Sequence, residues 1–413
     1  MTPLDFQKPE LLSPAGDRER LEAAVKFGAD AVYLGYTSLG MRASPQNFDR
    51  EQLKDACDYC RRAGVKVYLT ANIIPHNSDF RLAPELFGAA SDAGVDALII
   101  SDLGLMNVAK KLAPDIDIHV STQTGVTNYE TARLLFSMGA KRVVLARELS
   151  LEEIAEIRAK TPDEMEIECF VHGAMCVSFS GRCLLSNYLT GRDSNRGDCA
   201  QPCRWKYSLV EEKRPGQYFA IGEENGTYIM NSKDMCMIEH IPELVGAGVT
   251  SFKIEGRAKS AYYTAVITNA YRAAIDGFCK SPGLGYEPEE WIVGETRKVS
   301  HRDYCTGFFF GDPRDDACIY YDSGYVRDWQ VVAEVERSDN GRVYATQRNR
   351  FFENDELEAL TPGKKPVTLT VSDLRNGDGE KIEAAPHPMM RLSFACDTPI
   401  AAGSLLRMAC KNQ

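Results

Sequence analysis

The sequence predicts an α/β fold: a TIM-like (β/α)8 barrel with a long cysteine-bearing insertion, followed by a small antiparallel β-barrel domain. Three observations predict this fold. Short β-branched runs alternate with amphipathic helical stretches in the first two thirds of the chain, as in parallel βα units. These units span about 270 residues, close to the typical size of about 250 for such a barrel. From Gly324 onward, short alternating runs and dense turn signals replace the helical pattern.

The barrel prediction depends on eight segments with strand-like composition. They lie at 10–16, 29–35, 66–72, 97–102, 117–122, 141–147, 166–173 and 251–257. The helical stretches between them begin at capping-type residues such as Asp49 and Ser150, or end at glycines such as Gly28 and Gly64. A doubly wound open sheet is the alternative, because a single sequence does not show whether the sheet closes.

The same patterns divide the chain into three parts. The barrel is predicted over 1–285 and includes a candidate iron–sulfur segment at 169–236, a connector follows at 286–323, and the C-terminal β-barrel domain occupies 324–413. With 413 residues, 44% hydrophobic and 26% charged, the composition is that of a folded protein. Three arginines of the C-terminal domain are candidates for a local RNA-facing patch: Arg342, Arg348 and Arg350.

Polar residues follow the predicted strands at their C-terminal ends, where the chemistry of such barrels is located. We predict Gln123, Arg147, Lys253 and Arg257 as substrate-binding residues, since the basic groups can hold carboxylates of a small anionic substrate. The candidate catalytic residues are His172, Glu255 and Arg257.

A cluster of cysteines follows the seventh strand. Five of the thirteen cysteines fall between Cys169 and Cys203. Cys169 belongs to the strand itself, and the other four lie in the connection of about 75 residues after it, far longer than the usual βα loop. No signal peptide or membrane-spanning run is evident, so we expect a cytoplasmic, reducing location, where clustered cysteines usually bind metal. The spacing of Cys176, Cys183, Cys199 and Cys203 favours an iron–sulfur cluster, with zinc as the alternative.

Roles can also be predicted for three cysteines outside this cluster. Cys236 lies in the same long excursion and is a further candidate ligand, because ligands need only converge in space. Cys57 and Cys60 lie inside an amphipathic helical pattern with no partner pair nearby, so we expect them to act as small buried hydrophobes.

The formal net charge of −11 argues against nonspecific binding to nucleic acid, and no DNA or membrane partner is expected. The net charge is locally positive, however, because residues 174–214 carry seven basic and four acidic side chains. We therefore predict that RNA is bound by basic residues of this segment: Arg182, Arg192, Arg196, Arg204 and Lys206.

Several stretches resemble the bacterial collagenase-like peptidases of family U thirty-two. They are ELLSPAG, GADAVYLG, FVHGAMCVSFSGRCLLSNYLTGRDSNRG, GTYIMNSKDM and SFKIEGRAKSAYY, and they sample most of the predicted barrel. RELSLEEIAEIRAK and QPCRWKYSLVEE are most similar to members that modify tRNA. That resemblance implies oxygen-independent formation of 5-hydroxyuridine at the wobble position, with prephenate as co-substrate and an iron–sulfur cluster of the 4Fe-4S type.

The resemblance also implies a ligand set. The family's cluster ligands match Cys176, Cys183 and Cys199, and Cys236 matches the fourth, with Cys203 as the alternative. Prephenate carries two carboxylates, which suits the basic residues predicted at the strand ends.

Two competing functions remain. A collagenase-like protease is implied by the family name, although the sequence has neither an HExxH nor a GxSxG motif, which leaves a cysteine nucleophile with His172. Hydroxylation of a ribosomal RNA cytidine is known among relatives, and a subunit that binds RNA for a partner enzyme is a third possibility.

Overall fold

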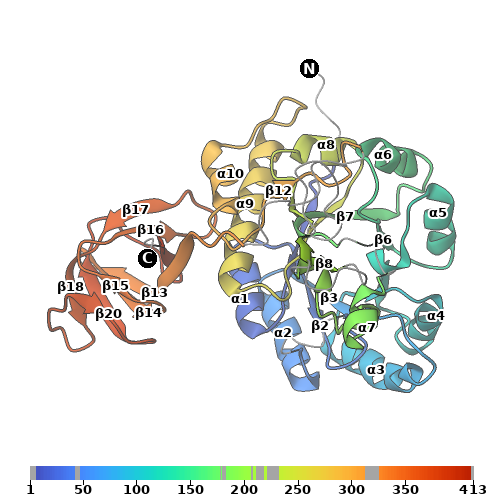
Figure 1. The fold of residues 1–413 in the computed structure, drawn as a ribbon, viewed down its shortest axis with the longest axis horizontal. Helices are drawn as coiled ribbons and strands as arrows, with labels where there is room; N and C mark the ends of the chain where they lie inside the picture. The colour runs from blue at the N-terminus through green and yellow to red at the C-terminus, as the bar shows by residue number, and fades with distance from the viewer. Residues whose placement is uncertain are drawn as a thin grey trace.

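The computed structural model describes residues 6–41, 47–176, 178, 183–205, 208–210, 218–220, 232–311 and 325–410. At Arg204, 208–210 and 218–220 it describes the backbone alone. Figure 1 shows two bodies, a barrel ringed by helices and a smaller β-sheet domain at its side.

Eight parallel strands form a closed barrel, which confirms the predicted fold and excludes the open sheet. The strands pair in chain order, and the last pairs with both the first and the seventh, so the sheet closes. They are β1 (Glu10–Pro14), β2 (Ala31–Gly35), β3 (Lys66–Ala71), β4 (Ala97–Ile100), β5 (Asp117–Val120), β6 (Arg142–Val144), β7 (Glu166–Ala174) and β11 (Ser251–Ile254).

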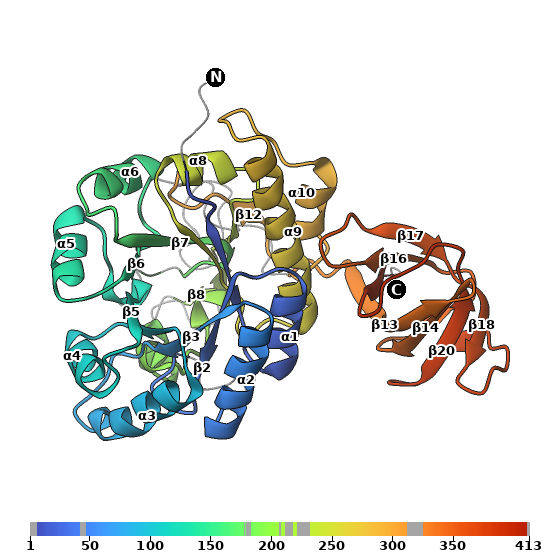
Figure 2. The same cartoon turned by 180° about the vertical axis from the view of Figure 1, so that it is seen from behind.

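Helices surround the barrel on its outside (Figures 1 and 2). Asp49 and Ser150 each form a capping box at a helix N-terminus, as their positions in the sequence suggested. The helices are α1 (Arg18–Lys26), α2 (Arg50–Arg62), α3 (Ala83–Ala93), α4 (Leu103–Leu112), α5 (Tyr129–Ser137), α6 (Leu151–Ala159), α8 (Ile241–Gly246), α9 (Ala261–Lys280) and α10 (Glu290–Thr296). No helix among the described residues is long and apolar enough to cross a membrane.

A buried ionic network fills the barrel near the N-terminal ends of its strands. Arg142 contacts Glu10 at 2.6 Å and Glu168 at 2.9 Å, and Glu168 also contacts Lys253 at 2.7 Å. Paired charges of this kind are tolerated inside a barrel because each is matched by an opposite charge. The network closes that end of the barrel, so the accessible end is the one where the strands terminate.

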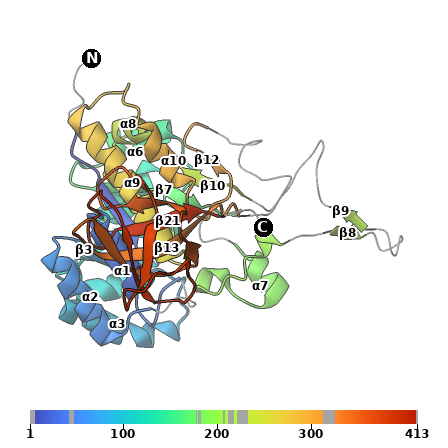
Figure 3. The ribbon, with the colours of Figure 1, turned by 90° about the vertical axis from the view of Figure 1, so that its left-hand side faces the viewer.

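The long connection after β7 lies over this accessible end. It contains α7 (Leu185–Thr190) and the short strands β8 (Ser208–Val210) and β9 (Tyr218–Ala220), which project from the barrel in Figure 3. The chain returns as β10 (Asp234–Cys236), which pairs with β7 and with β12 (Tyr304–Cys305). An Arg196–Asp79 ion pair at 2.7 Å ties the connection to the loop after β3.

The C-terminal domain is a curled sheet of seven antiparallel strands. Its order is β17-β16-β21-β13-β14-β20-β18, and the two outermost strands, β17 and β18, are joined by Val371 alone, so the sheet must curl. The strands are β13 (Trp329–Asp339), β14 (Arg342–Gln347), β16 (Glu356–Leu360), β17 (Val367–Thr370), β18 (Ser372–Asn376), β20 (Arg391–Ala395) and β21 (Leu405–Ala409), beside the small pair β15 (Phe351–Phe352) and β19 (Ala384–Ala385).

A buried ionic contact joins the two domains. Arg407, fully buried on β21, contacts Glu358 of its own domain at 2.7 Å and Glu295 of α10. Lys298 also contacts Glu358 at 2.7 Å, and its ammonium lies 4.8 Å from the ring centre of Trp329. The domains are therefore held together by charges that are matched across the interface.

Candidate active site

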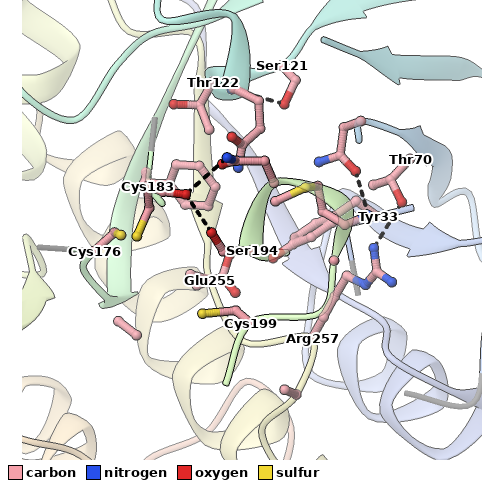
Figure 4. Close-up of a pocket in the computed structure, with 18 of the residues that line it drawn as sticks. Tyr33, Thr70, Ser121, Thr122, Cys176, Cys183, Ser194, Cys199, Glu255 and Arg257 are labelled. Carbon is pink, nitrogen blue, oxygen red and sulfur yellow. Dashed lines mark hydrogen bonds between the residues drawn. The ribbon is translucent and has the colours of Figure 1, made fainter. Parts of the chain in front are cut away.

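A cavity of about 690 Å³ opens at the C-terminal end of the barrel strands. Strand-end residues line it from one side and the cysteine-bearing connection from the other, as Figure 4 shows for Arg257, Thr70 and Tyr33 opposite Cys176 and Cys183. Its lining includes the following residues predicted from the sequence: Gln123, Arg147, Lys253, Glu255, Arg257, Arg192, Cys176, Cys183, Cys199 and Cys203.

Arg257 is held rigidly at the cavity wall. Its guanidinium donates to Thr70 Oγ1 and to Asn47 Oδ1, both at 2.9 Å, and the side chain is buried. A Cβ at Gly35 would collide with this guanidinium, so the glycine that ends β2 makes room for it. Glycine at this position therefore has a steric reason in the site itself.

Arg147 lies between the barrel wall and the cysteines. Its guanidinium stacks 3.9 Å from the ring centre of Phe170, donates to the Ala174 carbonyl at 2.8 Å and lies 3.8 Å from Glu255. Among the described residues, nothing accepts a hydrogen bond from its buried Nε, and nothing donates to the buried Oε1 of Gln123. Buried polar atoms that have no hydrogen-bond partner at a cavity wall indicate that the cavity binds a polar ligand.

Lys253 is less available to bind an anionic substrate than its position in the sequence suggested. Its ammonium contacts Glu168 at 2.7 Å and lies 4.6 Å from the ring centre of Tyr33. The lysine lines the cavity, but the partner carboxylate balances its charge. The sequence did not indicate this pairing, because Glu168 belongs to a strand 85 positions away.

The groups around Cys183 stabilise the deprotonated form of its thiol. Burial alone raises its pKa, but hydrogen bonds from Ser178, Ser194 and the backbone N–H groups of Leu185 and Ser186 outweigh this and hold the pKa below its usual value. The two N–H groups begin α7, where helix N-termini stabilise negative charge. The arrangement favours metal binding, which requires the deprotonated thiol.

The neighbouring cysteines complete the group. Burial raises the pKa of Cys176, and the nearby thiol of Cys183 adds to that shift. The backbone N–H of Gln201 donates to Cys199 Sγ at 3.3 Å, a kind of contact that also surrounds the sulfurs of iron–sulfur clusters. Cys203 lines the same cavity.

Four cysteine thiols line the cavity, and their number can be compared with what a metal site requires. Within the described residues, no three histidine, cysteine or carboxylate side chains are close enough to hold one metal ion. A cluster separates its thiolate ligands by its own width, so four thiols around one cavity match its requirement.

Cys236 is located elsewhere. It is on β10 opposite His172, and it is not among the described residues that line the cavity. Burial raises the pKa of its thiol to about 11, although hydrogen bonds from the Ile238 N–H and the Tyr271 hydroxyl oppose the shift. Cys203 therefore shares the cavity lining with the other three cysteines, whereas Cys236 does not, and its predicted role as a cluster ligand stays a prediction.

His172 also lies outside the cavity lining. It is buried among aromatic rings, with Tyr271 and Tyr304 hydroxyls at 3.4 Å from its two nitrogens. Burial lowers its pKa to about 3, so the imidazole is neutral at ordinary pH. Its backbone carbonyl accepts a hydrogen bond from the Glu255 N–H at 2.8 Å, but of these two residues only Glu255 is in the cavity lining, so the predicted catalytic role of the His172 imidazole gains no support from its position.

The predicted RNA-binding arginines differ in their surroundings. Arg192 is half-exposed at the cavity and contacts Asp198 at 2.7 Å. Both arms of Arg196 donate to Asp79, so this arginine anchors the connection to the barrel. Arg182 and Lys206 lie outside the described residues, and Arg204 is described by its backbone alone.

The sequence did not indicate which residues fix the predicted site side chains in place. Thr70 and Asn47 fix Arg257, and Phe170 lies under Arg147. Thr70 lies near the C-terminal end of β3, where site residues were expected, so the alternation of side chains along this strand could have identified it. Asn47 belongs to a loop and offered none.

Comparison with known proteins places this arrangement in a family. Residues 16–318 match the model of Peptidase family U32, and residues 327–407 match that of the Peptidase family U32 C-terminal domain. The tRNA hydroxylation protein P1 of Bacillus subtilis is 37% identical over 97% of this chain and 95% of its own.

Other similar proteins have different names. A 23S rRNA 5-hydroxycytidine synthase of Escherichia coli is 36% identical over 74% of this chain and 46% of its own length. A collagenase of Porphyromonas gingivalis is 36% identical over 77% of each chain. The match of both domains, in order and over most of the sequence, shows that the chain belongs to peptidase family U32.

Proposed function

We propose that this protein is an RNA-modifying hydroxylase that forms 5-hydroxyuridine at the wobble position of tRNA. The reaction needs no molecular oxygen, uses prephenate as co-substrate and requires a 4Fe-4S cluster. One observation carries the proposal: four cysteines and a set of anion-binding strand-end residues line the same cavity. Similarity to the tRNA hydroxylation protein P1 over nearly the whole chain supports the choice of tRNA.

Cys176, Cys183, Cys199 and Cys203 are the proposed cluster ligands. The cluster, when bound, supplies one-electron chemistry at the mouth of the barrel. The helix N-terminus at Cys183 and the N–H at Cys199 stabilise negative charge on the sulfurs. Arg147 lies close enough to affect the Cys176 thiol electrostatically, so it links the cysteine group to the substrate cavity.

Arg147, Arg257 and Gln123 are the proposed residues for the anionic co-substrate. Prephenate has two carboxylates, and two arginines on separate strand ends can each bind one. The Gln123 Oε1 and Arg147 Nε atoms, which have no hydrogen-bond partner in the described part of the chain, supply an acceptor and a donor for the remaining polar groups. Thr70 and Asn47 fix Arg257 before the ligand arrives, which reduces the entropy lost on binding.

The cysteine-bearing connection also offers a surface for RNA bases. Tyr188 on α7 is 81% exposed and Trp205 is 48% exposed, and both follow the cluster cysteines closely in the chain. Exposed aromatic rings near a reactive site stack unpaired bases, which is how single-stranded RNA is commonly held. A wobble nucleotide is unpaired in free tRNA and so is available for such stacking.

A peptidase is the second candidate, favoured by the name of the Porphyromonas gingivalis relative. A cysteine peptidase needs a thiol beside an imidazole base. Cys236 lies opposite His172 across β10 and β7, but neither is among the described residues that line the cavity. Burial raises the pKa of this thiol to about 11 and lowers that of the imidazole to about 3, the reverse of what an activated thiol–imidazole pair requires. The arrangement therefore favours the hydroxylase.

The direct test is the RNA of a strain that lacks the gene. Nucleosides from its tRNA and its ribosomal RNA should be compared with those of the parent strain by mass spectrometry. We expect 5-hydroxyuridine and nucleosides derived from it to disappear from tRNA alone, and to return with the wild-type gene but not with Cys183→Ala.

Two other outcomes of the nucleoside comparison would lead to different conclusions. Loss of a hydroxylated cytidine from ribosomal RNA would transfer the activity to the second RNA class. Unchanged nucleosides in both RNAs would refute the hydroxylase and leave the peptidase as the candidate.

A further inference from the structure

The C-terminal domain has a cavity of its own, on the surface of its sheet. It measures about 460 Å³ and lies across β13, β14, β18 and β20. In Figures 1 and 2, β18 and β20 lie on the side of the domain that faces away from the barrel. We call it the arginine groove after four of its lining residues: Arg337, Arg342, Arg375 and Arg391.

The arginine groove is positively charged in a chain whose net charge is −11. Its four arginines face a single lining carboxylate, that of Glu336. Asp373 nearby contacts Arg342 at 2.7 Å and Arg375 at 3.0 Å, which orients these two guanidinium groups. Arg391 is 80% exposed, and its nearest carboxylate, Glu336, is 3.6 Å away. A surplus of positive charge therefore remains for a ligand.

The groove also contains a stacking surface. The Arg337 guanidinium lies over the Tyr344 ring, 3.7 Å from its centre, so an aromatic ring holds a flat cationic group in the groove. Unpaired RNA bases stack on aromatic rings and on guanidinium planes of this kind. Gly377 and Gly379 form part of the rim, where the absence of side chains lets a backbone approach closely.

Resting on the proposed function, we propose that the arginine groove binds a single-stranded or looped part of the tRNA, at a distance from the nucleotide that is modified. Arginines contact its phosphates, and the Arg337–Tyr344 pair stacks with one base. Four arginines on a surface facing away from the cysteine cavity suit a polyanion that extends over both domains. A distant contact of this type adds affinity for the whole tRNA without entering the chemistry.

The test compares a whole unmodified tRNA with its anticodon stem-loop alone, using the full-length protein. Arg337→Glu/Arg391→Glu should weaken binding of the whole tRNA by about tenfold or more, because each charge reversal removes a charge-assisted contact. The dependence of log affinity on log salt should flatten by about 0.7 to 0.9 per lost phosphate contact. Binding and hydroxylation of the stem-loop should not change.

Matched variants separate the groove from general charge effects. Lys364→Glu/Lys365→Glu makes the same change of charge on exposed residues of the same domain outside the groove, and it should bind tRNA almost as the wild type does. Tyr344→Ala should weaken binding at least about fivefold, whereas Tyr344→Phe keeps the ring and should not.

Two results would overturn the proposal. One is full tRNA affinity in both groove variants, and the other is an equal loss in the lysine control. If the groove variants keep their affinity for tRNA but lose binding to poly-glutamate, the groove serves an acidic protein partner instead. If the wild type binds tRNA through the groove but hydroxylates neither RNA, the proposed function fails separately.

Discussion

At the scale of single residues, the fourth cluster ligand is the sharpest open choice. Cys203 lines the cavity with Cys176, Cys183 and Cys199, whereas Cys236 is on β10 beside Tyr271. The resemblance to the family favoured Cys236, whereas proximity in the sequence alone favoured Cys203. We propose Cys203 because it shares the cavity lining with the other three cysteines.

Iron content measured on anoxically purified protein distinguishes the two. We expect Cys203→Ala to lose most of its iron, because a cluster with three thiolates is exposed and labile, and Cys236→Ala to keep it. Cys60→Ala, which changes a buried cysteine of α2, is the control for general damage. Full iron in Cys203→Ala together with loss in Cys236→Ala would reverse the assignment.

Arg147 and Arg257 give a second prediction at this scale. Removal of either guanidinium should raise the prephenate concentration needed for half-maximal rate by about tenfold or more, since a charge-assisted hydrogen bond contributes roughly 1.5–3 kcal/mol. Arg62→Ala, an exposed change on α2, is the matched control. An unchanged requirement in both variants, with normal iron content, would place the co-substrate elsewhere.

Two buried histidines predict how stability depends on pH. Burial lowers the pKa of His172 to about 3 and that of His119 well below its ordinary 6.5. The unfolded chain binds these protons from about pH 6.5 downward while the folded chain does not, so the free energy of unfolding must fall on acidification through that range. Denaturant titrations at several pH values measure this dependence of the free energy of unfolding on pH. In His172→Phe, the free energy of unfolding should fall less steeply below about pH 6.5 than it does in the wild type. An identical slope in that variant would show that His172 is protonated in the folded protein.

Residues whose partners come from distant segments could not be assigned from sequence. Lys253 and Arg196 were predicted as binding groups from their type and position, but Glu168 and Asp79 occupy their charges. An ion pair between segments depends on side-chain geometry that no local pattern encodes. Arg147 and Gln123 were identified because strand ends of a barrel share one face, a rule that needs only the order of the strands.

At the scale of elements, buried parallel strands were the most predictable part. Seven of the eight predicted segments contain the whole observed strand, including the short β6, and β7 extends one residue beyond its segment. They were predictable because continuous apolar runs bounded by turns carry a local signal. The connection after β7 was predicted only as a long loop. Its return as β10 beside β7 is a nonlocal pairing, and Asp234–Cys236 is too short a strand to be recognised from its composition.

The C-terminal strands show a similar limit. Alternation and turn signals predicted an antiparallel domain, and the structure confirms it as a curled sheet. Its docking onto the barrel was not predicted, because it depends on Arg407 of β21 reaching Glu295 of α10. Neither residue stands out in its local sequence.

This contact gives a prediction for the element that carries it. Arg407→Ala should lower the free energy of unfolding by about 3–5 kcal/mol, since it leaves the buried Glu295 and its neighbour Glu358 with Lys298 as their one remaining cationic contact among the described residues. The comparison is Lys160→Ala, which removes an exposed ion pair with Glu156 and should cost less than about 1 kcal/mol. Denaturant unfolding of both variants measures the difference, and similar values would mean that the interface contact contributes little.

At the scale of the whole molecule, the two domains divide the work in the proposed account. The barrel supplies the cavity and the cysteines, and the C-terminal sheet supplies a separate basic surface. A chain with an overall charge of −11 can bind RNA in this way, because the positive charge is concentrated at the surfaces that the RNA would meet.

The account is tested most directly by the reaction itself. Anoxically purified protein with its cluster should be incubated with unmodified tRNA and prephenate, without oxygen, and the tRNA nucleosides measured by mass spectrometry. The account predicts a uridine that has gained one oxygen atom, dependent on prephenate and absent with Cys199→Ala. Iron-loaded protein that leaves tRNA unchanged but cleaves a collagen peptide would contradict it.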